Sequence, residues 1–256
     1  MYSNTVKMLV EFFEKHLDKS YFHAMCKNTN IPVRFFEKYL DKVDWFCICQ
    51  NTNIPIKFFE KNLDKICWYL LCQNKNIPVE FFEKHYDKIF WWCLCRNENI
   101  PVEFFEKNIK NVKWTHLCMN SNIPVSFFEK HIDKVKWSSL CINKNIPLYF
   151  YERNSNKIIW RFLSKNRNIP FSFFKENMDK LDWSGIFQND FKYHLRSVER
   201  EEYKKIMLKM FEKINHSVYA IPSNIFSILP KGGMGYLELI EKYKVCRAHT
   251  NVALKV

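Results

Sequence analysis

Six of the ten cysteines recur at a constant interval of 23 residues, and thiols are the side chains here best suited to hold a metal or form a disulfide. They are Cys26, Cys49, Cys72, Cys95, Cys118 and Cys141. The CxxC spacing typical of zinc sites is absent from the chain. Stacked helices lie about 8–10 Å apart, whereas a disulfide requires Cα atoms within about 4.4–6.8 Å. We therefore expect buried structural thiols, no metal site and no crosslink between neighbours.

Carboxylates, lysines and histidines also recur with the same interval, which could suggest acid–base chemistry. A Glu-Lys-x-x-Asp-Lys motif, seen in Glu37 to Lys42, has near-copies along the chain, which is typical of a solvated helix face. His16, His85 and His131 share a position where other copies carry Asn or Tyr, which indicates hydrogen bonding at the surface. The Gly-rich segment Lys231 to Gly235 lacks the Gly-Lys-Ser/Thr of a phosphate loop. No catalytic residue and no cofactor are predicted, and we do not expect an enzyme.

All these positions belong to one 23-residue unit that recurs eight times between residues 5 and 190. Seven Ile-Pro pairs mark it without an insertion or deletion, beginning at Ile31, Ile54, Ile77, Ile100, Ile123, Ile146 and Ile169. A constant period means that each copy is one supersecondary unit stacked on its neighbours. The sequence predicts an all-α fold, an α-solenoid of eight tandem two-helix repeats.

The copy from residue 53 to residue 74 illustrates the expected unit. Pro55 fits the first turn of a helix, which we expect to continue to Leu63. Asp64 is a candidate N-cap for a second helix, and Asn74 would end it. A leucine-rich-repeat-like unit with a strand is the alternative. The position three after Trp is always Leu or Ile while the position two after Trp is mixed, which favours the helix.

Helices this short are marginal in isolation, so aromatic positions that repeat across copies must build the core. The predicted structural core contains the Trp position of each copy: Trp45, Trp68, Trp91, Trp114, Trp137, Trp160 and Trp183. A recurring Phe pair accompanies it. The period of these rings fits a core better than a platform that stacks nucleic-acid bases.

Variable positions on the polar side of the second helix are where a repeat protein meets its partner. There we predict an exposed aromatic strip, the rings of Phe46, Tyr69 and Trp92, flanked by Gln50, Gln73 and Arg96. Aromatic residues and Arg are the usual anchors of protein interfaces. The alternative, equally open, is that these rings pack against the neighbouring helix.

The unit resembles a known class of repeat. The string FFEKHIDKVKWSSLCIN from Phe127 to Asn143, followed by Ile146-Pro147, is similar to short tandem repeats that giant and other large DNA viruses of protists encode in many copies. The resemblance covers residues 5–190. It implies an α-solenoid interaction protein of viral origin, with a host protein as partner and no catalytic residue.

Composition limits the function classes further. The net charge of +13 favours acidic partners, so a basic solenoid that binds nucleic acid through phosphate contacts is the alternative to a noncatalytic scaffold for protein–protein interaction. No apolar run of 18 residues and no apolar leader near Met1 are present, which predicts an intracellular protein, neither secreted nor transmembrane and without a membrane partner. No small-molecule substrate is evident.

Two segments are predicted: a helical tandem-repeat solenoid at residues 5–190, and a C-terminal helical cap with a small appended segment at residues 191–256. The 23-residue period stops after Asp190, and in the second segment Tyr203, Ile206 and Met210 share a helical register. Terminal units of a solenoid must cover its core, which is the role expected of this helix.

Overall fold

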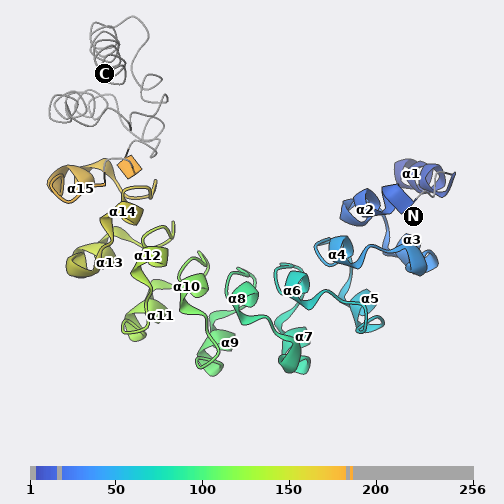
Figure 1. Ribbon diagram of the computed structural model, residues 1–256, viewed down its shortest axis with the longest axis horizontal. Helices are drawn as coiled ribbons and strands as arrows, with labels where there is room; N and C mark the ends of the chain where they lie inside the picture. Colours follow the sequence, from blue (N-terminus) through green and yellow to red (C-terminus); the bar gives the residue numbers. More distant parts are fainter. Residues whose placement is uncertain (1–3, 16–18, 183–184, 187–256) are drawn as a thin grey trace, which may run out of the picture. The chain divides into compact units, whose positions relative to one another are not determined.

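The computed structural model describes residues 4–15, 19–182 and 185–186 (Figure 1). Over these residues the chain forms fifteen short α-helices and three 3-10 helices at regular intervals, with no strand. This confirms the prediction of an all-α tandem-repeat fold and excludes the strand-containing unit for the described part. The chain divides into two compact units, residues 1–143 and 144–256. The predicted cap at residues 191–256 lies outside the described residues.

In the first unit the helices form two rows (Figure 1). The first-helix row contains α1 (Asn4–Lys15), α3 (Val33–Lys38), α5 (Ile56–Glu60), α7 (Val79–Lys84), α9 (Val102–Lys107) and α11 (Val125–Lys130). The second-helix row contains α2 (Lys19–Lys27), α4 (Trp45–Ile48), α6 (Trp68–Leu71), α8 (Trp91–Leu94), α10 (Trp114–Leu117) and α12 (Trp137–Leu140). The 3-10 helices η1 (Leu40–Lys42) and η2 (Tyr86–Lys88) come after α3 and α7.

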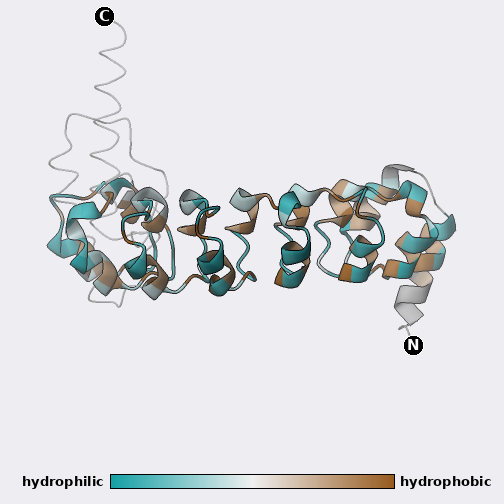
Figure 2. Cartoon of the chain, turned by 90° about the horizontal axis from the view of Figure 1, so that it is seen from below, coloured by the Kyte–Doolittle hydropathy of each residue, from teal (hydrophilic) through white to brown (hydrophobic). Residues whose placement is uncertain are grey.

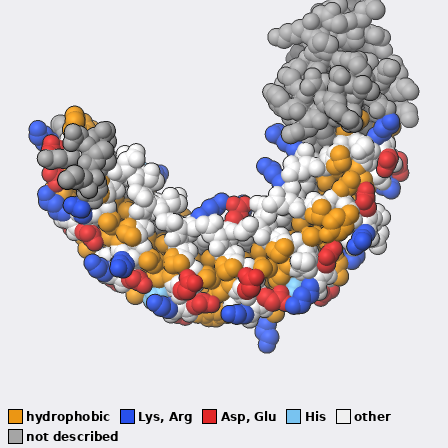
Figure 3. All heavy atoms as spheres, turned by 180° about the vertical axis from the view of Figure 1, so that it is seen from behind, with side chains coloured by type: hydrophobic (Ala, Val, Ile, Leu, Met, Phe, Trp, Pro, Cys, Tyr) orange, Lys and Arg blue, Asp and Glu red, His pale blue; other side chains and the backbone are white. Residues whose placement is uncertain are grey.

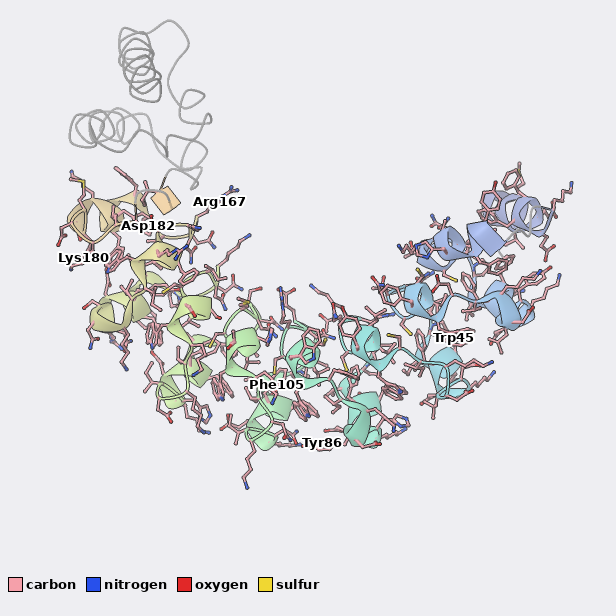
Figure 4. All side chains as sticks on the ribbon, in the orientation of Figure 1. Trp45, Tyr86, Phe105, Arg167, Lys180 and Asp182 are labelled. Atoms are coloured by element: carbon pink, nitrogen blue, oxygen red, sulfur yellow. The ribbon has the colours of Figure 1, made fainter. Side chains whose placement is uncertain are left out.

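The second unit continues the same pattern over its described residues. It contains α13 (Leu148–Arg153), η3 (Ser155–Lys157), α14 (Trp160–Leu163) and α15 (Phe171–Glu176). Arg167, Lys180 and Asp182 mark this part of the chain in Figure 4. Among the described helices of both units, none combines the length and apolar character needed to cross a bilayer.

In the copy from residue 53 to residue 74, both helices are shorter than the sequence pattern predicts. Pro55 is the N-cap of α5, with φ −70° and ψ 149°, and α5 ends at Glu60, so the prediction of a helix to Leu63 was wrong. The second helix begins at Trp68, so the prediction of Asp64 as its N-cap was also wrong. The reason is the buried aliphatic residue two before Trp. In equivalent copies this residue, Val43 or Ile89, is extended, which inserts its side chain into the core.

The core lies between the two rows and is built from the same positions in every copy. From α3 onward both members of each Phe pair are buried, including Phe81 at 2% and Phe82 at 0% exposure, whereas Phe12 of the first copy is 59% exposed. Adjacent helical residues point about 100° apart, so both can be buried only where the helix packs on two sides. Phe105, fully buried, illustrates this placement in Figure 4. Figure 2 shows the resulting separation of hydrophobic from hydrophilic residues on the helices.

The Trp side chains lie at the margin of this core, where they are half-buried. Each stacks on the first Phe of the next copy: the ring centroids of Trp45 and Phe58 are 5.6 Å apart, and those of Trp68 and Phe81 are 5.5 Å apart. The same stacking joins Trp91 to Phe104, Trp114 to Phe127 and, in the second unit, Trp160 to Phe173. The rings thus fasten one copy to the next. Trp183 lies outside the described residues.

The recurring asparagine has a different role from the one its position in the sequence suggests. Asn74 is 3% exposed, and its side chain donates hydrogen bonds to the carbonyl oxygens of Cys49 and Asn51 in the preceding copy, at 2.9 and 3.2 Å. Its Oδ1 accepts a hydrogen bond from the backbone nitrogen of Asn76 at 2.9 Å. Asn97 and Asn120 repeat the pattern. The prediction that Asn simply ends the second helix therefore understates its role as a buried link between copies.

The periodic thiols are buried hydrogen-bond acceptors. The Sγ atoms of Cys95 and Cys118 accept hydrogen bonds from the backbone nitrogens of Lys113 and Lys136, each at 3.4 Å. In the second unit Ser164 accepts the equivalent bond from the backbone nitrogen of Asp182 at 3.2 Å. A hydroxyl can therefore replace the thiol at this position, because both are small groups that accept a hydrogen bond.

Candidate protein-binding strip

The predicted aromatic strip lies on the second-helix row. Phe46, Tyr69 and Trp92 are each the second residue of a helix, on α4, α6 and α8. Phe46 is 54% exposed and Trp92 is 43% exposed, whereas Tyr69 is half-buried. Large rings at one position of three consecutive copies, two of them exposed, form a surface that solvent or a partner can reach.

The rings of the strip also contact one another. Tyr69 stacks on Trp92 with centroids 5.3 Å apart and an interplanar angle of 29°, and it meets Phe90 edge-on at 6.4 Å. Tyr69 therefore packs against the next copy, while Trp92 is still 43% exposed. Mutual stacking restricts the rotamers of these rings before any partner arrives.

The flanking polar residues lie just beyond the C-terminal ends of the same helices, and all three are exposed. Gln50 donates a hydrogen bond from Nε2 to the carbonyl oxygen of Phe46 at 3.2 Å. Gln73 donates from Nε2 to the Sγ atom of Cys93 at 3.4 Å. These bonds hold the two amides against the chain, while the Arg96 guanidinium lies at the exposed edge of the strip.

A neutral imidazole lies against the strip at its C-terminal end. The His116 ring is 5.9 Å from that of Trp92, and its Nδ1 is buried without a hydrogen-bond partner. Burial, aided by the nearby Arg96 cation, lowers the pKa of His116. The ring therefore extends the apolar surface beside Trp92 instead of adding a second positive charge.

Phe90 belongs to the strip but is missing from the sequence-based prediction. It is 44% exposed and is the N-cap residue of α8. The signal that could have found it is the position before Trp, which varies as strongly as the position after it: Tyr21, Asp44, Cys67, Phe90, Lys113 and Lys136. Adjacent variable positions on either side of Trp indicate one continuous surface.

No protein-family model, curated protein or solved structure matches this chain. A functional assignment therefore depends on the side chains of the chain itself.

The first-helix row offers a different surface, lined by ion pairs between copies. Lys38 pairs with Glu14 at 2.8 Å, and Lys130 and His131 both pair with Glu106. Figure 3 shows acidic and basic side chains interspersed on this side of the molecule. Exposed pairs of this kind contribute little stability, about 0–1 kcal/mol each. They match the solvated helix face expected from the Glu-Lys motif.

Metal-ligating side chains also meet at one place among the described residues. His23, Asp44 and Cys47 offer ligand atoms that all lie within 4.8 Å of one another. The absence of CxxC spacing, on which the prediction of no metal site rests, does not bear on this cluster, because its three residues come from two consecutive copies.

Proposed function

We propose that this chain is a noncatalytic scaffold, an α-solenoid of eight tandem repeats, that binds a protein partner through the aromatic strip of Phe46, Tyr69, Phe90 and Trp92. The observation that carries the proposal is the stacked pair of Tyr69 and Trp92, which leaves Trp92 43% exposed. Exposed aromatic clusters with an adjacent Arg have the composition of interface hot spots.

The strip has the physical properties that protein interfaces use. The ring of Tyr69 contacts those of Phe90 and Trp92, so ordering these three rings on binding costs little side-chain entropy. Burying the exposed part of one such ring stabilises a complex by about 1–2 kcal/mol. Three or four rings together supply the apolar centre of an interface, and Gln50 and Gln73 supply its polar rim.

Charge around the strip indicates the chemistry of the partner. Arg96 and Lys113 are exposed just beyond α8 and at the N-cap of α10, beside Trp92 and His116. Lys136 continues this border at the N-cap of α12. A matching protein surface presents apolar side chains bordered by carboxylates. The resemblance to repeats of large DNA viruses supports an intracellular host protein as this partner.

Nucleic acid is the second candidate, since stacked rings bordered by cations also bind single strands. The side chains that come after Arg96 at the same position are Met119 and Ile142, and neither forms hydrogen bonds with bases or phosphates. This favours the protein partner.

A pull-down from protist cell lysate tests the proposal, with and without nuclease. Wild type is compared with Phe46→Ala/Tyr69→Ala/Trp92→Ala and with a control, Leu63→Ala/Tyr86→Ala, which removes exposed apolar side chains elsewhere. We expect a nuclease-resistant protein that the control retains and the triple variant loses. Binding that nuclease abolishes, or that falls by about a thousandfold or more between 50 and 200 mM salt, would instead establish the nucleic-acid function.

A further inference from the structure

Three potential metal ligands meet where the first copy packs on the second. His23 on α2 faces α4, and its Nδ1 lies 2.8 Å from Oδ2 of Asp44 and 3.1 Å from Sγ of Cys47. Helices α2 and α4 pack directly on each other. An imidazole nitrogen, a carboxylate oxygen and a thiol sulfur, one from each residue, therefore surround one point.

The cluster combines accessibility with fixed ligands. The side chains of His23 and Asp44 are 56% and 30% exposed, so an ion can enter from solvent, while Cys47 is fully buried. The backbone nitrogen of Cys47 donates to Oδ1 of Asp44 at 3.1 Å. This bond orients the carboxylate and leaves Oδ2 directed at His23, as outer hydrogen bonds do for metal ligands.

The equivalent positions of the next copies hold no comparable set. They carry Phe46, Cys67 and Leu70 at the next interface, then Tyr69, Phe90 and Cys93, then Trp92, Lys113 and His116. Only at this one of the four interfaces compared do all three positions carry a potential metal ligand, contributed by two copies. Packing between copies does not require such a set, because other side chains fill the same place further along.

We propose that His23, Asp44 and Cys47 bind one Zn²⁺ ion. Nitrogen, oxygen and sulfur are all zinc ligands, and three protein ligands leave a fourth position for water or a ligand from a partner. Tetrahedral zinc with bonds of about 2.0–2.3 Å separates its ligand atoms by about 3.4–3.7 Å. The exposed His23 ring has to move outward by about 0.5 Å from Asp44 and Cys47 to admit the ion.

Binding releases the thiol proton of Cys47 to solvent and involves no electron transfer. Nδ1 of His23 binds through its lone pair, so the neutral imidazole carries its single proton on Nε2. Burial and the Asp44 carboxylate raise the pKa of Cys47, and the Lys27 ammonium lowers it, so the ion has to displace the thiol proton against a net raised pKa. The bound ion would join the first two copies, next to Phe46 at the beginning of the strip.

Titration of the reduced, full-length chain with Co²⁺, followed by competition with Zn²⁺, tests the site. The readout is the thiolate-to-cobalt charge-transfer band. The variants are Cys47→Ser and His23→Ala, and the matched control is Cys93→Ser, which removes a thiol from the same position two copies later. Far-UV circular dichroism of each apo variant separates loss of the ligand from loss of the fold.

We expect one equivalent of cobalt to produce the band in wild type and Cys93→Ser, and zinc to abolish it. Cys47→Ser loses the band, and His23→Ala weakens the affinity by at least about tenfold with its circular dichroism unchanged. Absence of the band in wild type overturns the proposal. So does a band that survives in Cys47→Ser or an affinity that His23→Ala leaves unchanged.

Discussion

The side-chain nitrogen of Asn74 donates a hydrogen bond to the carbonyl oxygen of Cys49, a residue 25 positions earlier, at 2.9 Å. The same nitrogen also reaches the carbonyl oxygen of Asn51. One buried amide therefore satisfies two backbone acceptors at the end of a helix in the preceding copy. These are among the carbonyls that a helix end cannot satisfy internally. The asparagine position thus supplies a buried hydrogen-bonded link between consecutive copies, in addition to the stacked Trp and Phe rings.

Loss of the Asn74 side-chain hydrogen bonds should destabilise the fold. Asn74→Ala leaves the carbonyl of Cys49 and the backbone nitrogen of Asn76 without this partner, while the Asn51 carbonyl keeps its bond from the Ile54 backbone nitrogen. We expect the free energy of unfolding to fall by about 2–3 kcal/mol. The control is Asn76→Ala, because Asn76 is exposed and its amide donates one bond to Thr52. That change should cost about 0.5–1 kcal/mol. Urea unfolding monitored by circular dichroism measures both, and equal losses would show that burial of the amide is unimportant.

The Trp–Phe stacking between copies makes a separate prediction. Trp68→Ala removes a half-buried ring that stacks on Phe81 at an interplanar angle of 12°, and it should cost about 2–3 kcal/mol. Trp68→Phe retains part of the contact and should cost less than half as much. A double-mutant cycle with Phe81→Leu measures the coupling across the interface. Strictly additive losses would contradict a direct link between these copies.

The buried thiols predict a pH dependence of stability. Burial raises the pKa of Cys72 to about 12 and the pKa of Cys95 to about 11. Unfolded thiols lose their protons at about pH 8.5, whereas the folded ones keep theirs, so the unfolded state binds fewer protons above that pH. Stability should therefore be complete below about pH 8.5 and fall as the pH rises toward 11, by up to about 1.4 kcal/mol per pH unit for each thiol.

The variant Cys72→Ala/Cys95→Ala isolates this effect. It should be less stable than wild type at neutral pH, because it leaves small cavities, yet its stability should decline less steeply between pH 9 and 11. Denaturant unfolding at a series of pH values gives both slopes. Parallel curves for the two proteins would show that other groups cause the alkaline loss.

The fold class can be predicted from the sequence because constant spacing requires one unit per period, and Leu71 and its equivalents recur at helical spacing. Helix lengths cannot be predicted in this way, since Val43 and Ile89 interrupt a helical pattern by entering the core in an extended conformation. The burial of Asn74 cannot be predicted from the sequence either, because the carbonyl groups that accept its hydrogen bonds belong to the preceding copy. Comparison of the same position in successive repeats identifies Phe46, Tyr69 and Trp92 as a run of aromatic residues at a variable position. Contacts between different positions, such as those joining His23 to Asp44, require the structure.

Hydrogen exchange of the complex with the recovered partner tests the central claim most directly. The account predicts slower exchange in peptides that cover α4, α6 and α8, where the strip lies, and unchanged exchange in α5, α7 and α9 on the other row. The triple variant should show neither binding nor protection, whereas Leu63→Ala/Tyr86→Ala should match wild type. Protection confined to the first-helix row, with α4, α6 and α8 unaffected, would contradict the assignment of the strip as the binding surface.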